Sequence, residues 1–365
     1  MINEIYQLEI ELSTKCNARC PQCSRNYFGS YTWPTLPLVD LDFNTIKNSI
    51  SHSTWNNLKH IKFCGTYGDP CMHKDLIEII KWVKSNSPAS ITINTNGGIR
   101  SKKWWSNLAE ILNPLTDKVF FGIDGLDDTN HLHRIGVDYS KVIKNLRAFN
   151  DAGGHSVWSF LVFKHNQHQV PLAEKTAKLL GCKNFVWKST SRFLNKAHQL
   201  IKFSPVLNDQ GQKVYVLNPT TDNEYKNAGY DDYIKVSNEY QSYNNYSKVA
   251  KIECKALKQQ IVYISAEGDV FPCGWLSDRM YGYEAESTPD HKLLLDIIET
   301  IGGKNKINLH YSKFEDIIHG EWFSIIEQKR NTNQLYRCAF ICGTESTLIE
   351  KANTQTSKVW AGKKL

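Results

Sequence analysis

The first half of the sequence alternates short β-rich runs with longer helical patterns, and this alternation restricts the possible folds more than any other feature. Predicted strands lie at Ile5–Leu12, His60–Phe63, Ser90–Asn94, Lys118–Ile123, Val157–Phe163 and Asn184–Lys188. Helical patterns between them lie at Asp75–Ser85, Lys102–Leu112, Tyr139–Asn150 and Gln169–Leu180. Six β/α units in series predict a parallel sheet, either curved into an open barrel or wound flat.

The alternation stops after Thr190. The segment 191–249 is rich in Asn, Tyr, Lys and Asp and has few apolar runs, so it is predicted to be a connector or an insertion. Two β signals return at Gln260–Ser265 and Val270–Pro272, with a turn at Glu267-Gly268-Asp269 between them. A chain of 365 residues is long enough for one large α/β domain and an appendage.

The sequence carries no sign of export or membrane insertion. No apolar run approaches the roughly 18 residues of a membrane span, and the first residues include acids where a signal peptide carries bases. A soluble, cytoplasmic protein with no membrane partner is therefore predicted. The net charge of +7 is scattered along the chain, which gives no strong nucleic-acid signal. Ten cysteines without a secretory signal indicate metal binding rather than disulfides.

Three cysteines directly follow the first predicted strand, with the spacing C-x3-C-x2-C. Cys16, Cys20 and Cys23 thus fall on a loop at the carboxyl end of a strand, where ligands gather in barrels and in open parallel sheets. Three thiolates at this spacing can bind three irons of a [4Fe-4S] cluster and leave the fourth iron open. A zinc knuckle is the alternative, but no fourth Cys or His follows within 25 residues.

This cysteine pattern on a chain of six β/α units resembles the radical S-adenosylmethionine (SAM) superfamily. The segment Phe63–Pro70, after the second strand, is similar to the Gly-Gly-Glu-Pro type segment with which the family holds the amino group of SAM. The resemblance implies SAM contacts at Gly65, Gly68 and Asp69, because glycines permit close backbone approach and a carboxylate accepts hydrogen bonds from an ammonium. Asp69 stands in place of the more usual glutamate. A plain β-turn is the alternative.

Segments after the third and fourth strands extend the resemblance. Asn96 falls where the family commonly offers polar groups near the SAM ribose. Asp124 lies in a segment similar to the Ser-x-Asp-Gly segment of a subgroup with cysteine-rich C-terminal extensions, although Gly122 replaces the serine. Arg134 lies in a stretch whose arginine, in that subgroup, pairs with the SAM carboxylate. Gln22 stands where the family usually has an aromatic residue, so the adenine contact is expected to differ there.

The late cysteines resemble the auxiliary-cluster domains of the same family. Cys254 and Cys273 flank the predicted hairpin, which turns at Gly268, and Cys338 and Cys342 form a C-x3-C pair. A hairpin brings the first two cysteines together, and the pair can complete a four-thiolate site. Four cysteines suit the shortened, twitch version of the SPASM domain, which implies one auxiliary [4Fe-4S] cluster. A structural Zn(Cys)4 site is the alternative.

These features together predict an α/β protein built as a partial (β/α)6 TIM-like barrel with a small C-terminal β-hairpin and helix domain that holds iron and sulfur. The predicted boundaries are 1–190 for the radical SAM barrel, 191–249 for the connector or insertion, 250–345 for the twitch-like domain and 346–365 for a C-terminal tail or helix.

The resemblance implies two [4Fe-4S] clusters, SAM, and a low-potential electron donor such as flavodoxin or ferredoxin. Reductive cleavage of SAM would then yield a 5′-deoxyadenosyl radical that abstracts a hydrogen atom from the substrate, which is a peptide or protein side chain in the leading hypothesis. A small polar or phosphorylated metabolite is the enzymatic alternative, and an iron–sulfur redox sensor or binding protein is the non-enzymatic one. The stretch Phe185–Phe193 and the connector either line a polar substrate pocket or form ordinary surface.

Overall fold

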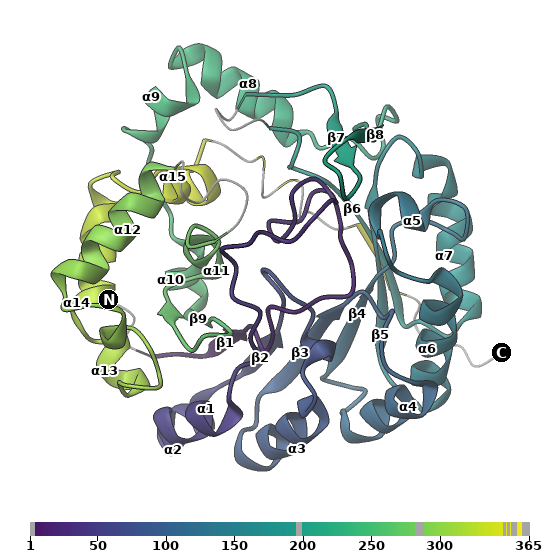
Figure 1. Cartoon of the computed structure of the whole chain (residues 1–365), viewed down its shortest axis with the longest axis horizontal. Coiled ribbons are helices and arrows are strands. Elements are labelled where there is room, and N and C mark those ends of the chain that lie inside the picture. The colour runs from purple at the N-terminus through teal and green to yellow at the C-terminus, as the bar shows by residue number, and fades with distance from the viewer. Residues whose placement is uncertain are drawn as a thin grey trace.

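One nine-stranded sheet organises the protein and curves into an open barrel (Figure 1). The computed structural model describes residues 4–194, 199–281, 288–345, 348, 351 and 356–359. The sheet has the order β10-β9-β1-β2-β3-β4-β5-β6-β11, parallel from β9 to β6 and antiparallel at both edges. Its strands are β1 (Gln7–Ile10), β2 (His60–Phe63), β3 (Ser90–Thr95), β4 (Lys118–Gly122), β5 (Ser156–Val162), β6 (Asn184–Ser189), β9 (Ile261–Ile264), β10 (Val270–Phe271) and β11 (Thr356–Val359).

Helices cover the outside of the curved sheet. Those of the first half are α1 (Phe43–Ser49), α2 (His52–Asn57), α3 (Leu76–Asn86), α4 (Lys102–Ile111), α5 (Asn130–His133), α6 (Tyr139–Asp151) and α7 (Val170–Leu179). The second half of the chain contains α8 (Gly229–Glu239), α9 (Tyr243–Ser247), α10 (Lys255–Gln259), α11 (Gly274–Ser277), α12 (Pro289–Thr300), α13 (Phe314–Ile318), α14 (Glu321–Asn331) and α15 (Tyr336–Cys342), of which α8 and α9 lie away from the sheet (Figure 1). The predicted α/β fold with a partial barrel is confirmed, since β1 to β6 correspond to the six predicted strands.

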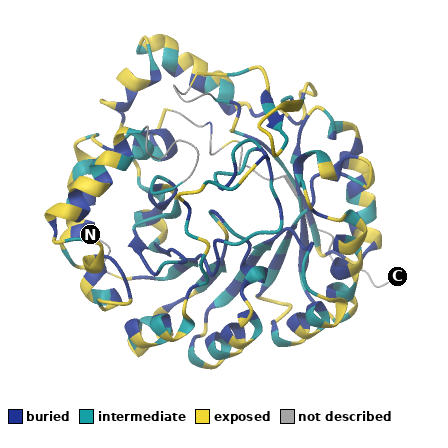
Figure 2. Ribbon diagram, viewed as in Figure 1, coloured by how far each residue is buried: buried dark blue, intermediate teal, exposed yellow. Residues whose placement is uncertain are grey.

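Local sequence explains these elements. In β3 the side chains alternate between partly exposed and buried, and Ile91 and Ile93 are fully buried. Helix α3 carries its buried residues on one stripe. Side chains also cap the helices, because the Ser101 hydroxyl accepts a hydrogen bond from the backbone of Trp104 at the start of α4. The outcome is visible in Figure 2, where the helices around the barrel are exposed on their outward faces and buried toward the sheet.

The late hairpin belongs to the barrel sheet rather than to a separate sheet of a C-terminal domain. Strand β9 pairs in parallel with β1, with Gln7 opposite Ile261 and Ile10 opposite Ile264. The sequence predicts the hairpin of β9 and β10 correctly but gives no sign of this partner. The physical reason is that β1 would otherwise be an open edge of the sheet, with backbone groups in need of partners. The helices α10 to α15 lie together on this side of the barrel (Figure 1).

The opposite edge of the sheet is completed from the end of the chain. Strand β11 runs antiparallel to β6, with Thr356 opposite Trp187 and Val359 opposite Asn184. The segment 346–365, predicted to be a tail or helix, therefore contains a strand. Most of the other residues of this segment lie outside the described part of the chain.

The connector 191–249 is folded and reaches across the open side of the barrel. It contains the antiparallel hairpin of β7 (Ser204–Leu207) and β8 (Lys213–Leu217), followed by α8 and α9. Near one end, Phe193 packs in a small cluster with Phe163, and near the other end Tyr246 packs in a cluster with Phe340 of α15. Contacts at both ends thus join the β5 side of the barrel to the late helices.

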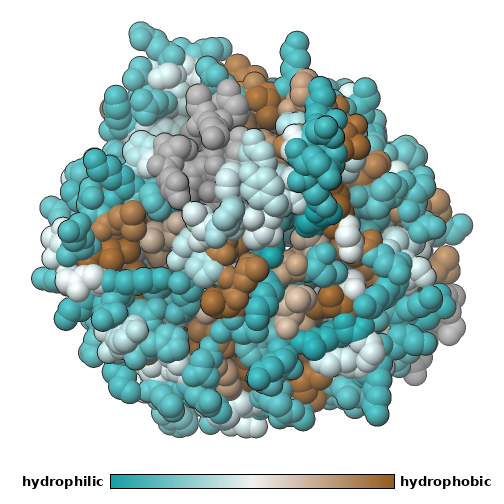
Figure 3. Space-filling view, in the orientation of Figure 1, coloured by the Kyte–Doolittle hydropathy of each residue, from teal (hydrophilic) through white to brown (hydrophobic). Residues whose placement is uncertain are grey.

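Among the described residues, no helix is both long enough and apolar enough to cross a lipid bilayer. In the space-filling view, hydrophilic side chains dominate the outline of the molecule, and apolar side chains appear in patches that extend over the middle of the face (Figure 3).

Candidate active site

The early cysteine loop leaves the carboxyl end of β1. The Cys16 sulfur accepts a hydrogen bond from the backbone of Ala18 at 3.4 Å, and the backbone of Cys23 donates to the Cys20 carbonyl at 3.1 Å. The three thiols are free, Cys20 is buried, and Cys16 and Cys23 are partly buried. The chain from the end of β1 onward passes across the barrel interior in Figure 1. This loop therefore presents three thiols at the end of the barrel where active sites of such folds lie.

The loop after β2 packs tightly against the end of β1. A Cβ atom on Gly65 would overlap the carbonyl oxygen of Gly68, and a Cβ on Gly68 would overlap the carbonyl oxygen of Ser13. The close backbone approach that the sequence predicts at both glycines is thus made within the chain itself. It brings the second loop into contact with the segment that carries the cysteines.

Glu11 holds these two segments together and was not predicted as a site residue. Its carboxylate accepts hydrogen bonds from the backbones of Tyr67 at 2.6 Å and Gly68 at 3.0 Å and from the hydroxyl of Tyr263 at 2.7 Å. Burial raises the pKa of Glu11 to about 7, although these hydrogen bonds oppose the shift. The available signal in the sequence was an acidic residue at the end of a predicted buried strand, five positions before Cys16.

Asp69 joins the loops after β2 and β3. Its carboxylate accepts hydrogen bonds from the hydroxyl of Thr95 at 2.9 Å and from the backbones of Asn96 at 2.8 Å and Cys71 at 2.9 Å. The residue is 3% exposed, and burial raises its pKa. Its electrostatic field reaches the thiol of Cys16, so this carboxylate lies beside the cysteine loop.

Asn96 contacts the cysteine loop directly. Its side-chain nitrogen donates to the side-chain oxygen of Asn17 at 2.8 Å and lies 3.7 Å from the Cys16 sulfur. Its side-chain oxygen accepts a hydrogen bond from the backbone of Gly98 at 2.8 Å. The structure thus brings Asn96 together with Cys16 and Asp69, three residues that the sequence places on three different loops.

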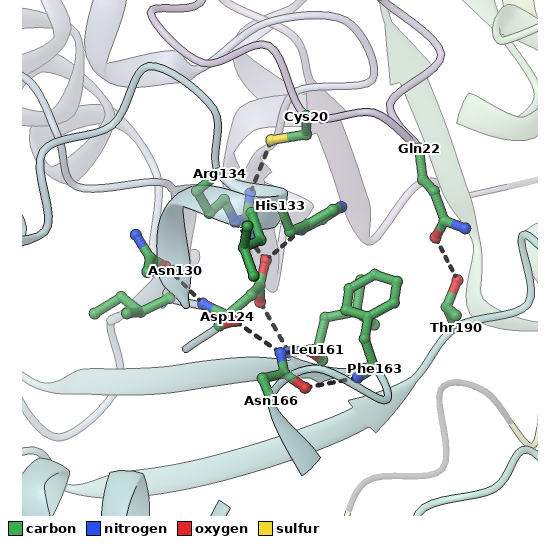
Figure 4. A network of polar contacts seen from close by, with 12 residues as sticks. Cys20, Gln22, Asp124, Asn130, His133, Arg134, Leu161, Phe163, Asn166 and Thr190 are labelled. Carbon is green, nitrogen blue, oxygen red and sulfur yellow. Dashed lines mark hydrogen bonds and ion pairs between the residues drawn. The ribbon is translucent and has the colours of Figure 1, made fainter. Parts of the chain in front are cut away.

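Asp124 and Arg134 form the buried network of Figure 4. One carboxylate oxygen of Asp124 lies 2.5 Å from Arg134 Nε and 2.8 Å from His133 Nδ1, and the other accepts from the backbone of Leu161 at 2.8 Å. The Nη1 atom of Arg134 donates to the sulfur of Cys20 at 3.8 Å. Burial alone would raise the pKa of Asp124, but Arg134 and His133 hold it well below its usual range. Asp124 is therefore buried and paired with Arg134.

Gln22 is tied to the carboxyl end of β6. Its side-chain oxygen accepts a hydrogen bond from the Thr190 hydroxyl at 3.0 Å (Figure 4), and Arg192 donates to its backbone carbonyl. The sequence singles out Gln22 as a departure from an aromatic residue but predicts neither partner. These bonds connect the cysteine loop to the start of the connector.

The four late cysteines line one cavity. Cys254 precedes α10, Cys273 lies between β10 and α11, and Cys338 and Cys342 lie in α15. A hydrogen bond between Cys254 and Cys342 lowers the pKa of Cys254 below its usual value. The remaining lining is largely apolar and includes Ile252, Pro272, Trp275, Ile326 and Ile341, together with Arg330 and Arg337.

The spacing of the side chains bears on the zinc alternative for both cysteine groups. A single zinc ion needs sulfurs within about 4 Å of one another, because each Zn–S bond is about 2.3 Å long. Within the described ranges, no three Cys, His, Asp or Glu side chains are arranged to hold one metal ion.

Comparison with protein families agrees with the fold of the first half of the chain. Residues 10–173 match the family model described as the Radical SAM superfamily. This part of the chain is therefore similar to the radical SAM superfamily, whose members are enzymes that use a [4Fe-4S] cluster and SAM. No curated protein sequence matches the chain.

Solved structures show the same fold at low sequence identity. Hexahistidine-tagged anSMEcpe with bound AdoMet has a TM-score of 0.53 and 14% identity, and the match covers 93% of this chain and 86% of that chain. Streptococcus suis SuiB bound to the precursor peptide SuiA has a TM-score of 0.51 and 14% identity, with 93% and 72% covered. For Streptococcus suis SuiB bound to S-adenosylmethionine the match has a TM-score of 0.45 and 15% identity and covers 75% of this chain, which spans 61% of that SuiB chain.

Proposed function

We propose that this chain is a radical SAM enzyme that cleaves SAM reductively and abstracts a hydrogen atom from a peptide or protein side chain. One observation carries the proposal. The loops after β1, β2, β3 and β4 bring the three early cysteines together with Asp69, Asn96 and Arg134 at the carboxyl end of the barrel. When bound, a [4Fe-4S] cluster and SAM supply there a 5′-deoxyadenosyl radical.

The early cysteines fit such a cluster. Cys16, Cys20 and Cys23 are free thiols on one short loop, and three thiolates leave one iron of a cubane without a protein ligand. In this proposal Asp69, beside Cys16, accepts hydrogen bonds from the SAM amino group, and Arg134 offers a guanidinium nitrogen to the SAM carboxylate. Gly65 and Gly68 shape the loop that carries Asp69, Asn96 lies beside the ribose, and Asp124 orients Arg134.

The late cysteines fit a second, auxiliary [4Fe-4S] cluster. In the proposal all four thiols that line the cavity are ligands, and the apolar lining excludes water and further ligands. A cluster with four protein ligands suits electron transfer, so we assign it the electron that remains after hydrogen abstraction. Residues 250–345 then act as the twitch-like part, although their hairpin shares the barrel sheet. A low-potential donor such as flavodoxin or ferredoxin supplies the first electron.

The substrate class rests on two structures of similar fold. SuiB was solved with the precursor peptide SuiA, and anSMEcpe was solved with AdoMet and a Kp18Cys peptide, the latter with a TM-score of 0.50 and 15% identity. Both were thus solved with bound peptides. We extend this class of substrate to the present chain, which would receive it at the open end of the barrel.

Isotope transfer tests both parts of the proposal. Reconstituted, reduced enzyme is incubated with SAM and a fully deuterated lysate of the source cells, divided into small metabolites and into peptides and proteins. Release of 5′-deoxyadenosine, absent in Cys16→Ala, supports SAM cleavage. Deuterium in 5′-deoxyadenosine from the macromolecular fraction, abolished by protease treatment, supports a peptide or protein substrate. Deuterium from the metabolite fraction alone would overturn the substrate class, and no 5′-deoxyadenosine in any sample would overturn the radical mechanism.

A further inference from the structure

Arg134 is held between a buried carboxylate and a cysteine of the early loop. Its Nε lies 2.5 Å from Asp124 Oδ2, and its Nη1 donates to the Cys20 sulfur at 3.8 Å (Figure 4). These partners come from positions 134, 124 and 20, so the contact exists only in the folded chain. The guanidinium is a permanent positive charge with a rigid fork of donors.

The Asp124 carboxylate is itself fixed. It is 1% exposed, and besides its ion pair with Arg134 it accepts hydrogen bonds from His133 Nδ1 and from the backbone of Leu161, both at 2.8 Å. The backbone nitrogen of Asp124 donates to the side-chain oxygen of Asn130 at 3.0 Å. A carboxylate bound on several sides cannot swing away, so it sets the direction in which the guanidinium points.

Gly122 provides the space for the guanidinium. A Cβ atom at position 122 would overlap Arg134 Nη2 and would lie 3.0 Å from its Cζ. Any larger residue there would displace the guanidinium from its present position. This packing gives a physical reason for glycine at a position where the family resemblance predicts serine.

We propose that Arg134, oriented by Asp124 and accommodated by Gly122, donates a hydrogen bond to the Cys20 thiolate and thereby raises the reduction potential of the cluster bound at Cys16, Cys20 and Cys23. The inference rests on the proposed function. Adding an electron makes the cluster and its thiolates more negative, so a nearby positive charge and an N–H donor stabilise the reduced state more than the oxidised state. Hydrogen bonds to cluster sulfurs and local charge are established determinants of such potentials.

The test is a redox titration of the reconstituted, SAM-free enzyme, monitored by electron paramagnetic resonance. The signal of the early cluster is identified by its loss in Cys16→Ala. In Arg134→Gln we expect the ratio of reduced to oxidised early cluster at a fixed potential to fall about tenfold, which corresponds to about 59 mV for a one-electron couple. Arg134→Lys keeps the positive charge but loses the planar set of guanidinium donors. A smaller fall in the ratio of reduced to oxidised cluster is therefore expected.

Arg147→Gln is the matched control, because Arg147 is an exposed residue of α6 and the charge change is the same. Its titration curve is expected to coincide with that of the parent. Equal iron content in all the variants excludes loss of the cluster as the cause of a shift.

The possible outcomes separate the inference from the proposed function. A parent without a signal that depends on Cys16 would refute the proposed function. A parent signal whose titration is unchanged in Arg134→Gln, together with weakened SAM binding, would leave the proposed function intact and overturn the inference, because Arg134 would then serve the SAM carboxylate alone. A shift of the reduction potential in Arg134→Gln that equals the shift in Arg147→Gln would also overturn the inference.

Discussion

Cys16, Cys20 and Cys23 lie among polar, hydrogen-bonded groups, whereas the four late cysteines line a largely apolar cavity. Around the early loop, Asn96 and Arg134 direct N–H donors at cysteine sulfurs. Around the late cavity, isoleucine, proline and tryptophan side chains dominate the lining. The two groups therefore differ mainly in the polarity of the side chains around them, since both consist of cysteine thiols. A polar, open loop suits a cluster that exchanges ligands, and an apolar cavity with four thiols suits one that is closed.

The strongest test of this contrast compares one cysteine from each site. Cys16→Ala is expected to reduce SAM cleavage below detection, because in the proposed function it removes a ligand of the cluster that binds SAM. Cys273→Ala is expected to retain SAM cleavage but to lose completed product. The measurement is 5′-deoxyadenosine and product by liquid chromatography and mass spectrometry under reducing conditions. Equal loss of SAM cleavage in both variants would remove the functional distinction between the sites.

SAM affinity sharpens the assignment of polar groups to the early site. Asp69→Ala is expected to weaken SAM binding about ten- to a hundredfold, since a hydrogen bond to a charged group is worth roughly 1.5–3 kcal/mol. Equilibrium binding to the reconstituted, unreduced enzyme measures the effect. Asp75→Ala is the matched control, because Asp75 is an exposed carboxylate six residues away. Equal SAM affinities in the two variants would show that Asp69 does not bind SAM and has a purely structural role.

The pH dependence of stability tests how the early site is supported. The pKa of Glu11 is raised from 4.5 to about 7 in the folded protein, so the folded state binds more protons than the unfolded state between these values. Stability is therefore expected to fall as the pH rises from about 5 to 7, with a contribution from Glu11 of at most about 1.4 kcal/mol, or tenfold in the unfolding constant, per pH unit.

Glu11→Gln should remove that contribution. Urea midpoints of the parent and the variant, measured anaerobically from pH 5 to 8, give the difference directly. A difference between the two proteins that stays constant over this range would show that Glu11 is not protonated as its burial implies.

Iron content provides the smallest expected change, a factor of two. The reconstituted parent should contain about eight irons per chain, from two four-iron clusters. Replacing the three early cysteines or the four late cysteines by alanine should each leave about half. Zinc that persists in the early-cysteine variant, with iron never above about four in the parent, would identify the late cavity as a zinc site.

The sequence predicts the barrel strands well because their patterns are local. The prediction at 60–63 coincides with β2, and the other five strands of the first half fall within one to two residues of the observed ends. The connector 191–249 was not predictable in this way. Its hairpin and helices depend on contacts with distant residues such as Phe163 and Phe340, and no short window of sequence contains those partners.

In the candidate site, too, residues that belong to a local pattern were predicted, and residues that depend on distant partners were not. The spacing predicted Cys16, Cys20 and Cys23 as ligands, and the resemblance to auxiliary-cluster domains grouped the late cysteines, which line one cavity in the structure. Glu11, Thr190 and Arg192 were missed, because their importance comes from partners on other loops. Arg134 was predicted as a SAM-binding residue, but its contact with Cys20 was not predicted.

The sequence by itself determined the β/α alternation, the cysteine spacings and the glycines that permit tight loops, since each of these is encoded within a few residues. The tertiary structure alone decided that β9 closes the edge of β1, that β11 closes the edge of β6, and that Arg134 meets Cys20 across 114 positions of the chain. The physical reason is that backbone groups at a sheet edge, and a buried charge, must find partners wherever the fold supplies them. Which partners are available depends on the fold of the whole chain, so no local sequence pattern predicts them.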